Sequence, residues 1–343
     1  MRNYQLTFHS SYHSWLIVAL IWLFIMSGLT LFVGDTPWQS VWQGINERLF
    51  NGTSNWNPLL DERIPRLIVL ICTGASLAVC GAMMQSLFHN PLASPSILGI
   101  SSGGCLSVIL VFIYQLYHSY PFFIPLAAFL GCFLTLCLVY GLAKFQHGKY
   151  LTNLILTGIA ISTLLISVQG LILYALRDHW QLIQTITEWE AGSLNDRHWQ
   201  HVHMQLPLTL IGLMGCWYYR SELNLLALGE EEATHLGVDV KLVRRNLFFC
   251  IALLTGGVLA AVGVIPFFGL ILPHLIRRLF GCNHFIMIPF CIIGGAGVFI
   301  LMDLILRVFD LHNISIGNLS AVIGGLFFLY LLFKPQPNPS QSI

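Results

Sequence analysis

The sequence predicts an all-α polytopic membrane protein with about ten transmembrane helices. Hydrophobic residues make up 56% of the 343 residues and charged residues only 9%, whereas charged residues are about a quarter of a soluble domain. The apolar residues form continuous runs and do not alternate with polar ones, which favours a helical bundle over a barrel. At about 20 residues for each span, the chain is long enough for some ten helices with short connections.

The apolar runs predict the spans in order. The first run is too long for the apolar core of a signal peptide, and "GDTPW" follows it in place of a small-residue cleavage site, so we expect it to be retained. The eighth contains Pro266 and Pro273 and is expected to be tilted or broken. The expected spans are 14–33, 64–86, 96–115, 121–143, 152–174, 204–219, 243–262, 265–280, 285–305 and 318–333. Together they form one transmembrane domain, 1–343, that ends in a polar tail, 335–343.

Lysine and arginine residues favour an orientation with both termini inside. Inner loops of membrane proteins carry an excess of these residues, and this orientation gives them an excess over the outer loops. The inner residues are Lys144, Lys149, Arg220, Lys241, Arg244, Arg245, Arg277, Arg278 and Lys334. Arg63, Arg66 and Arg307 then lie at the outer surface, against the rule. These three arginines therefore need a separate explanation.

The chain contains an internal repeat. "RIPRLIVLICTGASLAVCG" from Arg63 aligns with "RNLFFCIALLTGGVLAAVG" from Arg245 at an offset of 182, and the same offset pairs Pro91 with Pro273 and Gly99 with Gly281. The repeat halves are approximately 63–175 and 245–334, and in the expected topology they cross the membrane in opposite directions. Inverted repeats are common in transporters, so the pattern favours a transporter over a membrane enzyme.

Small residues gather on one side of the second span and of its repeat. They are Gly74, Ala75, Ala78, Gly81 and Ala82, and then Gly256, Gly257, Ala260 and Gly263. Small residues let helices approach closely in lipid. We therefore expect close packing in preference to the lining of a pathway.

The segment from Gly229 to Val240 is the longest polar stretch between the inner spans. Three consecutive glutamates, Glu230 to Glu232, precede a short helix-compatible stretch that ends at Gly237. From the residues alone, a docking surface for a soluble partner and a solvated hairpin are equally compatible with this stretch.

No sequence motif indicates catalysis within the chain. The phosphate-binding G-x-x-x-x-G-K-[ST] loop, H-E-x-x-H and G-x-S-x-G are all absent. Ionisable residues within the spans are sparse, and for Asp303 an ion pair with Arg307 one turn later is favoured over proton or sodium coupling. His198, His201 and His203 lack a carboxylate or cysteine to complete a ligand set, so no metal site is expected. No basic tract suits nucleic acid.

Seven segments in order narrow the interpretation. They are "RIPR", "GAMMQSLFHNPLASPSILGISSG", "EWEAGSL", "LNLLALGEEEATHLGVDV", "GVIPFFGLILPHLIRR", "MDLILR" and "IGNLSAVIGGLFFLYLLFK". Over about Arg63 to Lys334, this set resembles the permease subunits of bacterial ATP-driven importers for iron chelates, haem and cobalamin, the FecCD type. The resemblance implies a type II ABC importer transmembrane domain in the bacterial inner (cytoplasmic) membrane, with both termini cytoplasmic.

The resemblance also implies partners. The chain itself is expected to be no enzyme and to bind no cofactor, while two cytoplasmic ABC ATPase subunits use ATP and magnesium. An extracytoplasmic substrate-binding protein delivers the cargo, and a second permease, identical or paralogous, completes the path within membrane lipid. The cargo implied first is a ferric siderophore, with haem or cobalamin as the alternative. An ion-coupled secondary carrier is a less favoured class.

Roles for particular residues follow from the same resemblance. The cytoplasmic coupling loop, approximately 221–241, docks on the ATPase, and Arg63, Arg66 and Arg307 meet glutamates of the binding protein. The turn from His89 to Ser96 matches a cytoplasmic gate, in which Asn90 caps the backbone freed by the prolines and Leu92 seals the path; a plain tight turn is the alternative. The coupling residues are Leu226, Gly229, Glu230, Glu231, Ala233, Leu236 and Gly237, and the gate residues are Asn90, Leu92, Leu151 and Thr152.

Near the last span the sequence departs from the family pattern. "NISIGN" and "GGLFF" lack the usual glutamate and prolines, and in "GVIPFF" the proline is displaced. We therefore expect the outer turn before the last span to differ from that of relatives.

Overall fold

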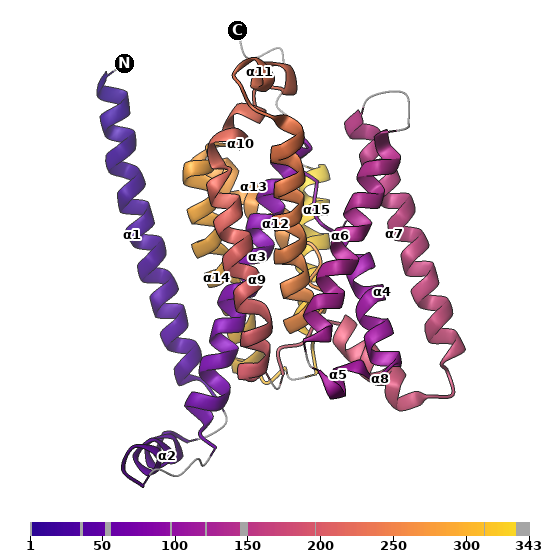
Figure 1. Ribbon diagram of the computed structural model, residues 1–343. Helices are drawn as coiled ribbons and strands as arrows, with labels where there is room; N and C mark the ends of the chain where they lie inside the picture. The colour runs from indigo at the N-terminus through magenta and orange to yellow at the C-terminus, as the bar shows by residue number, and fades with distance from the viewer. Residues whose placement is uncertain are drawn as a thin grey trace.

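The computed structural model describes residues 2–34, 37–51, 56–96, 98–120, 122–144, 150–195, 197–311 and 313–333, and within these ranges its regular structure is helical (Figure 1). The predicted tail, 335–343, lies outside the described residues. The helices that match the ten expected spans are α1 (Arg2–Phe32), α3 (Ile64–Leu87), α4 (Ile100–Ile113), α6 (Phe123–Lys144), α7 (Tyr150–Ala175), α9 (Trp199–Tyr218), α12 (Val240–Ala261), α13 (Phe268–Phe280), α14 (His284–Val308) and α15 (Ile316–Phe333). The fold class is therefore confirmed.

Shorter elements join these helices. They are α2 (Trp38–Asn51), the π-helical turn η1 (Pro58–Arg63), α5 (Leu116–Ser119), α8 (Trp180–Glu190), α10 (Arg220–Leu226) and α11 (Glu230–His235). Figure 1 shows α10 and α11 at one end of the bundle, which we call the α11 end, and α2, α5 and α8 at the opposite end, the α8 end. α1 begins at the α11 end, so successive long helices run alternately between the two ends.

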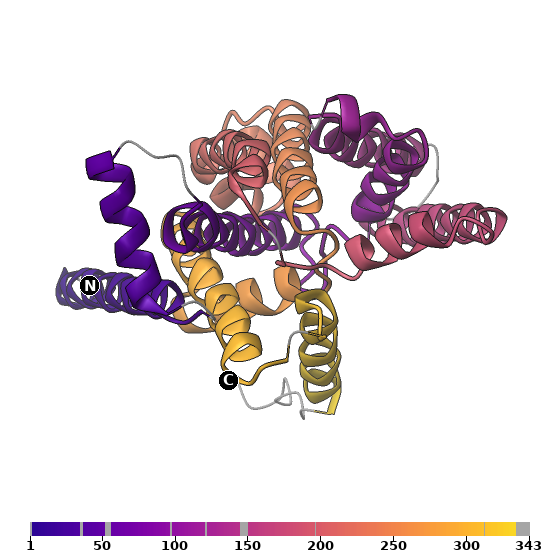
Figure 2. The same ribbon diagram turned by 90° about the horizontal axis from the view of Figure 1, so that it is seen from below.

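Apolar length marks the spans, and burial separates the centre of the bundle from its rim. Among the described residues, six helical segments are long and apolar enough to cross a bilayer. Within the most apolar stretch of each, 89% of residues are buried for Pro58–Leu87 but only 6% for Tyr12–Phe32. Figure 2 accordingly shows α3 in the middle of the bundle and α1 at its edge. The exposed apolar surface of α1 suits contact with lipid.

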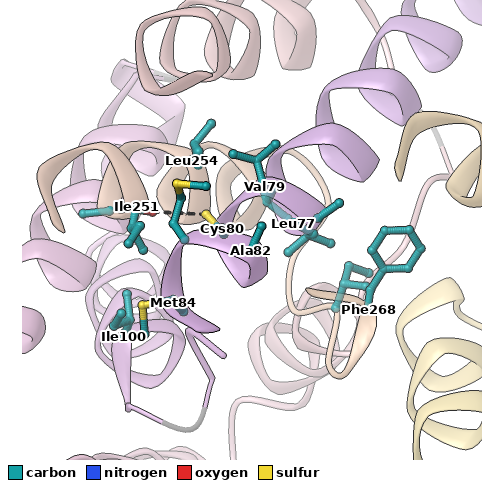
Figure 3. Packing of buried hydrophobic residues seen from close by; sticks show 14 of the residues in the cluster. Leu77, Val79, Cys80, Ala82, Met84, Ile100, Ile251, Leu254 and Phe268 are labelled. Carbon is teal, nitrogen blue, oxygen red and sulfur yellow. Dashed lines mark hydrogen bonds between the residues drawn. The ribbon is translucent and has the colours of Figure 1, made fainter. Parts of the chain in front are cut away.

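The two copies of the repeat cross the bundle in opposite directions, as expected. Cys80 of α3 lies 3.7 Å from the hydroxyl of Thr255 in α12, and further along α3 the ring of Phe88 stacks on Phe248, earlier in α12 (Figure 3 shows the Cys80 region). α3 and α12 are therefore antiparallel.

The structural repeat is shorter than the sequence alignment. Pro91 lies in the turn after α3, whereas Pro273 lies inside α13; Gly99 precedes α4, whereas Gly281 follows α13. The pairing of these residues therefore does not hold in the structure. The chain paths diverge because α12 ends at Ala261, about two turns earlier than the equivalent position of α3, which continues to Leu87.

Small residues pack helices against each other, as predicted. A Cβ atom on Gly74 would lie 2.2 Å from the carbonyl oxygen of Gly295 in α14, and one on Gly81 would lie 1.5 Å from that of Gly269 in α13. Only a residue without a side chain allows backbones to approach this closely. Glycine thus fixes α3 between α13 and α14.

Candidate functional site

The arginines at the α8 end form a cluster around one buried carboxylate. Asp303 of α14, only 1% exposed, pairs with Arg307 one turn later at 3.0 Å and with Arg66 of α3 at 2.6 Å. The predicted ion pair between Asp303 and Arg307 is confirmed. Arg66 is a partner that the sequence did not indicate, since it lies 237 positions away. The three side chains lock α3 to α14 and leave one net positive charge.

Arg63, just before α3, and Arg307 also donate hydrogen bonds to carbonyl groups at the C-terminal end of α1. Arg63 donates to the carbonyl oxygen of Leu31 at 2.9 Å, and Arg307 donates to that of Val33 at 2.7 Å. The last carbonyl groups of a helix lack partners within the helix and carry partial negative charge, so cations there are favourable. Arg63, Arg66 and Arg307 thus have partners within the chain, which explains their place against the positive-inside rule. Their docking role stays a prediction.

A cavity of about 720 Å³ opens at the α8 end beside this cluster. Its wall includes Arg66, Arg307 and Asp303 on one side, Trp189 of α8, and Arg197 of the loop that follows α8. Asn195, Asn313, Asn318, Ser193, Ser315 and Glu188 add further polar groups. Burial raises the pKa of the Glu190 carboxyl at the end of α8. A space of this size with many polar groups can hold a hydrophilic small molecule.

The histidines near this end serve local hydrogen bonds. A ring nitrogen of His198 lies 3.2 Å from the carbonyl oxygen of Asp61, and one of His201 lies 3.1 Å from the guanidinium of Arg197. In the described part of the chain, no three histidine, cysteine, aspartate or glutamate side chains come together as a metal site.

At the α11 end, the segment predicted to dock on an ATPase folds as an ordered pair of short helices. Leu226 and Ala233 are buried, and the carboxylate of Glu230 pairs with the guanidinium of Arg244 in α12. Gly229 and Gly237 flank α11 with φ of 127° and 90°, a conformation that glycine adopts without strain. Leu226 and Ala233 thus face inward, Gly229 and Gly237 form the ends of α11, and Glu230 is held by Arg244 although its side chain is 46% exposed.

The outward side of this pair is apolar as well as acidic. Leu228 is 63% exposed and Leu236 is 59% exposed, next to exposed Glu231 and Glu232. Exposed leucines on a short polar segment at the end of a bundle suit a protein partner. Of the predicted coupling residues, Glu231 and Leu236 thus have exposed side chains, as does Glu230, which is already paired with Arg244.

The turn after α3 has the backbone cap that we expected. The side-chain oxygen of Asn90 accepts the backbone N–H of Leu92 at 2.9 Å, and Leu92 itself is exposed. Leu151 and Thr152 begin α7, and their side chains lie outside the described part of the structure. Whether Leu92 seals a path stays a prediction.

Two histidines join this turn and its neighbours to α10, which the sequence did not indicate. His89 lies 2.9 Å from the carbonyl oxygen of Leu226 at the end of α10. The ring of His284, in the first turn of α14, lies 2.7 Å from Asn224 of α10 on one side and 2.7 Å from Ser86 of α3 on the other. These hydrogen bonds connect α10 directly to α14 and to the turn, and through His284 to α3.

Comparison with known proteins identifies the chain. The sequence pattern of the FecCD transport family matches residues 19–334. The chain belongs to the FecCD transport family. The hemin transport system permease protein HmuU of Yersinia pestis is 34% identical over 309 residues, 85% of this chain and 89% of that protein. The iron(3+)-hydroxamate import system permease protein FhuG of Bacillus subtilis is 35% identical over 284 residues, 80% of this chain and 83% of that protein.

A solved structure shares the fold. A metal-chelate type ABC transporter in an inward-facing conformation has a TM-score of 0.79 and 30% identity, covering 94% of this chain and all of the other. This FecCD protein is accordingly a multi-pass permease subunit of an ATP-driven importer. Hydrolysis of ATP belongs to a separate chain, in agreement with the absence of a phosphate-binding loop motif.

Proposed function

We propose that this FecCD permease moves a ferric siderophore across the bacterial inner membrane, from the cavity at the α8 end to the α11 end. The observation that carries the proposal is the placement of two different surfaces at opposite ends of one bundle. A polar cavity lies at the α8 end, and an exposed apolar and acidic surface lies on α10 and α11. Cargo enters at the first surface and ATPase subunits act on the second.

The cavity wall contains apolar residues such as Phe112 and Ile314, but its charged and amide groups favour a hydrophilic iron chelate over haem. Hemin and iron-hydroxamate permeases are almost equally identical to this chain, at 34% and 35%, so similarity alone does not select the cargo. Haem presents a large flat apolar surface, which an apolar pocket suits better than a wall with Arg66, Asn195, Arg197 and Asn313. Haem and cobalamin are the alternative cargoes of the same machine.

The partners follow from the same two ends. Two cytoplasmic ABC ATPase subunits dock through Glu231, Leu236 and their neighbours, and a second permease, identical or paralogous, completes the path. At the α8 end, carboxylates of an extracytoplasmic binding protein meet the arginine cluster. Arg66 lines the cavity and, unlike Arg63 and Arg307, does not hold the end of α1, so we assign it this role in addition to its pair with Asp303.

Asp303 gives an argument against an ion-coupled carrier. A carboxylate that binds and releases a coupling ion must be able to change its charge or its partner. Asp303 instead is held between two guanidinium groups. Uptake that continues in the presence of an uncoupler, with ATP maintained, is expected.

The deciding experiment measures uptake of radiolabelled ferric siderophore, haem and cobalamin, in parallel, by cells with and without this gene. Loss of siderophore uptake alone is the expected result. Loss of haem or cobalamin uptake instead would keep the importer and overturn the cargo. If uptake of all three is unchanged in cells without redundant importers, the proposed transport is wrong.

A further inference from the structure

The connection between α1 and α3 carries a helix that the transport function does not use. α2 lies across the end of α1 at the α8 end (Figures 1 and 2). A string of aromatic rings runs from one helix onto the other. The ring of Phe32 lies 4.9 Å from that of Trp38, which lies 6.4 Å from that of Trp42. Phe32 is 65% exposed and Trp42 is 59% exposed.

The rest of α2 is divided between attachment and water. Val41 is buried, and its carbonyl oxygen accepts the side-chain N–H of Asn57 at 3.0 Å. Arg48 pairs with Asp61 of η1 at 2.5 Å, which fastens α2 to the start of the second span. Ser40, Gln43 and Glu47 are exposed polar residues on the side of α2 away from Trp38 and Trp42, and exposed Phe50 lies at the edge of this polar side. The helix is therefore attached on one side, polar on a second and aromatic on a third.

The position of the string relative to α1 indicates what covers it. The apolar stretch of α1, Tyr12–Phe32, ends at the first ring of the string. This apolar stretch has 21 residues, or about 31 Å at 1.5 Å for each residue, which matches the hydrocarbon thickness of about 30 Å. The string therefore lies where α1 leaves the hydrocarbon, the level at which tryptophan is enriched in membrane proteins.

We infer that α2 is an interfacial helix that lies in the headgroup layer of the outer leaflet, with Trp42 turned toward the acyl chains. The exposed apolar surface of α1, with Phe24 and Ile25, continues through Phe32 onto Trp42. The lipid that contacts α1 therefore also contacts this side of α2. An amphipathic helix with tryptophan on one side and polar residues on the other binds in this layer.

α2 also contacts the arginines at the α8 end. The guanidinium of Arg63 lies 5.4 Å from the centre of the Trp38 ring, within the range of a cation–π contact. Arg63 also binds the last carbonyl groups of α1. Lipid contact on α2 therefore holds the end of α1, and the cluster beside it, at a fixed depth in the membrane.

Spin labels test the inference. Nitroxides are attached at position 42 (Trp42→Cys) and, as the matched control, at exposed position 40 on the opposite side of α2 (Ser40→Cys), with the two exposed cysteines replaced by Cys137→Ser and Cys282→Ser. The full chain is placed in nanodiscs of phosphatidylcholine and phosphatidylglycerol. Relaxation by oxygen, relative to a water-soluble nickel chelate, should be several-fold greater at position 42 than at position 40. Equal ratios at the two positions would overturn the inference.

A second measurement keeps the tryptophan in place. Brominated lipid quenches nearby indole fluorescence, and the unmodified protein should lose more fluorescence in such lipid than Trp42→Phe does. Equal quenching of the two proteins would contradict lipid contact. Access of the nickel chelate to position 42 that closes only when the purified binding protein is added would assign this surface to that protein instead.

Discussion

At the scale of single residues, the charges at the α8 end act first within the chain. Three arginines and Asp303 connect the end of α1 to α3 and α14 through ion pairs and bonds to carbonyl groups. The sequence places Arg63, Arg66 and Arg307 at the outer end because loop charges define the topology. It does not reveal how far they are buried, since the partners lie up to 277 positions away.

Substitution of Arg66 distinguishes a role in docking the binding protein from a role in holding the helices together. In Arg66→Gln, Asp303 keeps its pair with Arg307, so the bundle should still fold, while the cavity wall loses one cation. Affinity for the binding protein should fall about fivefold, because a partly exposed ion pair contributes about 1 kcal/mol. The loss should be greater at low salt, where screening is weaker. The affinity is measured by titrating the purified binding protein onto the permease in nanodiscs, at low and at high salt.

The matched control is Arg177→Gln, which removes an exposed arginine next to Tyr174 just before α8, outside the cavity wall. It makes the same change of charge at the same end of the molecule. Equal loss of affinity in both variants would mean that overall charge, and not Arg66, attracts the partner.

At the scale of helices, α11 is the element that we predict to couple the permease to the ATPase. Leu236→Ala together with Glu231→Ala removes exposed groups and leaves the inward contacts of Ala233 and Glu230 intact. Stimulation of ATP hydrolysis by cargo and binding protein should be lost along with uptake, while the permease remains folded. Leu279→Ala, an exposed leucine in the last turn of α13, is the control. Unchanged stimulated hydrolysis and uptake in the double variant would contradict docking through α11.

Close packing of α3 gives a second prediction at this scale. In Gly81→Ala the new methyl group would lie 1.5 Å from the carbonyl oxygen of Gly269, so the two helices must separate. Overpacking of this kind costs about 1–3 kcal/mol. In Gly170→Ala on α7, nothing lies within 4 Å of the added atom. Thermal unfolding in detergent should therefore show a lower transition for Gly81→Ala and no decrease for Gly170→Ala; the same decrease in both would disprove the packing argument.

The sequence predicts the long helices better than the short ones, for a physical reason. Membrane spans need continuous apolar runs, so the sequence contains their positions directly. α2 and α8 mix polar and apolar residues and cross nothing, and neither was predicted. The links of His89 and His284 to α10 were also missed, because a lone histidine carries no signal of its distant partner. The Asn90 cap was predicted because its partner is two residues away.

At the scale of the whole molecule, the direction of transport requires that the α11 end face the cytoplasm. Of the 16 lysine and arginine residues in the sequence, six belong to segments at the opposite end (Arg48, Arg63, Arg66, Arg177, Arg197 and Arg307), and the larger share belongs to the connections expected at this end, among them Arg220, Lys241, Arg244, Arg245, Arg277 and Arg278. Inner loops collect such residues. At the opposite end, Arg63, Arg66 and Arg307 bind carbonyl groups or Asp303, which accounts structurally for these three exceptions to the rule.

A natural thiol reports this orientation. Cys282 is exposed between α13 and α14, where the neighbouring Asn283 accepts a hydrogen bond from Asn224 of α10 at 3.0 Å. A membrane-impermeant maleimide should label Cys282 in inside-out vesicles and leave it unlabelled in intact spheroplasts. In Ser40→Cys, on the exposed side of α2, the new thiol should behave in the opposite way. Cys282→Ser identifies the labelled residue, and labelling of Cys282 from outside would place the ATPase surface on the wrong side and refute the proposed direction of import.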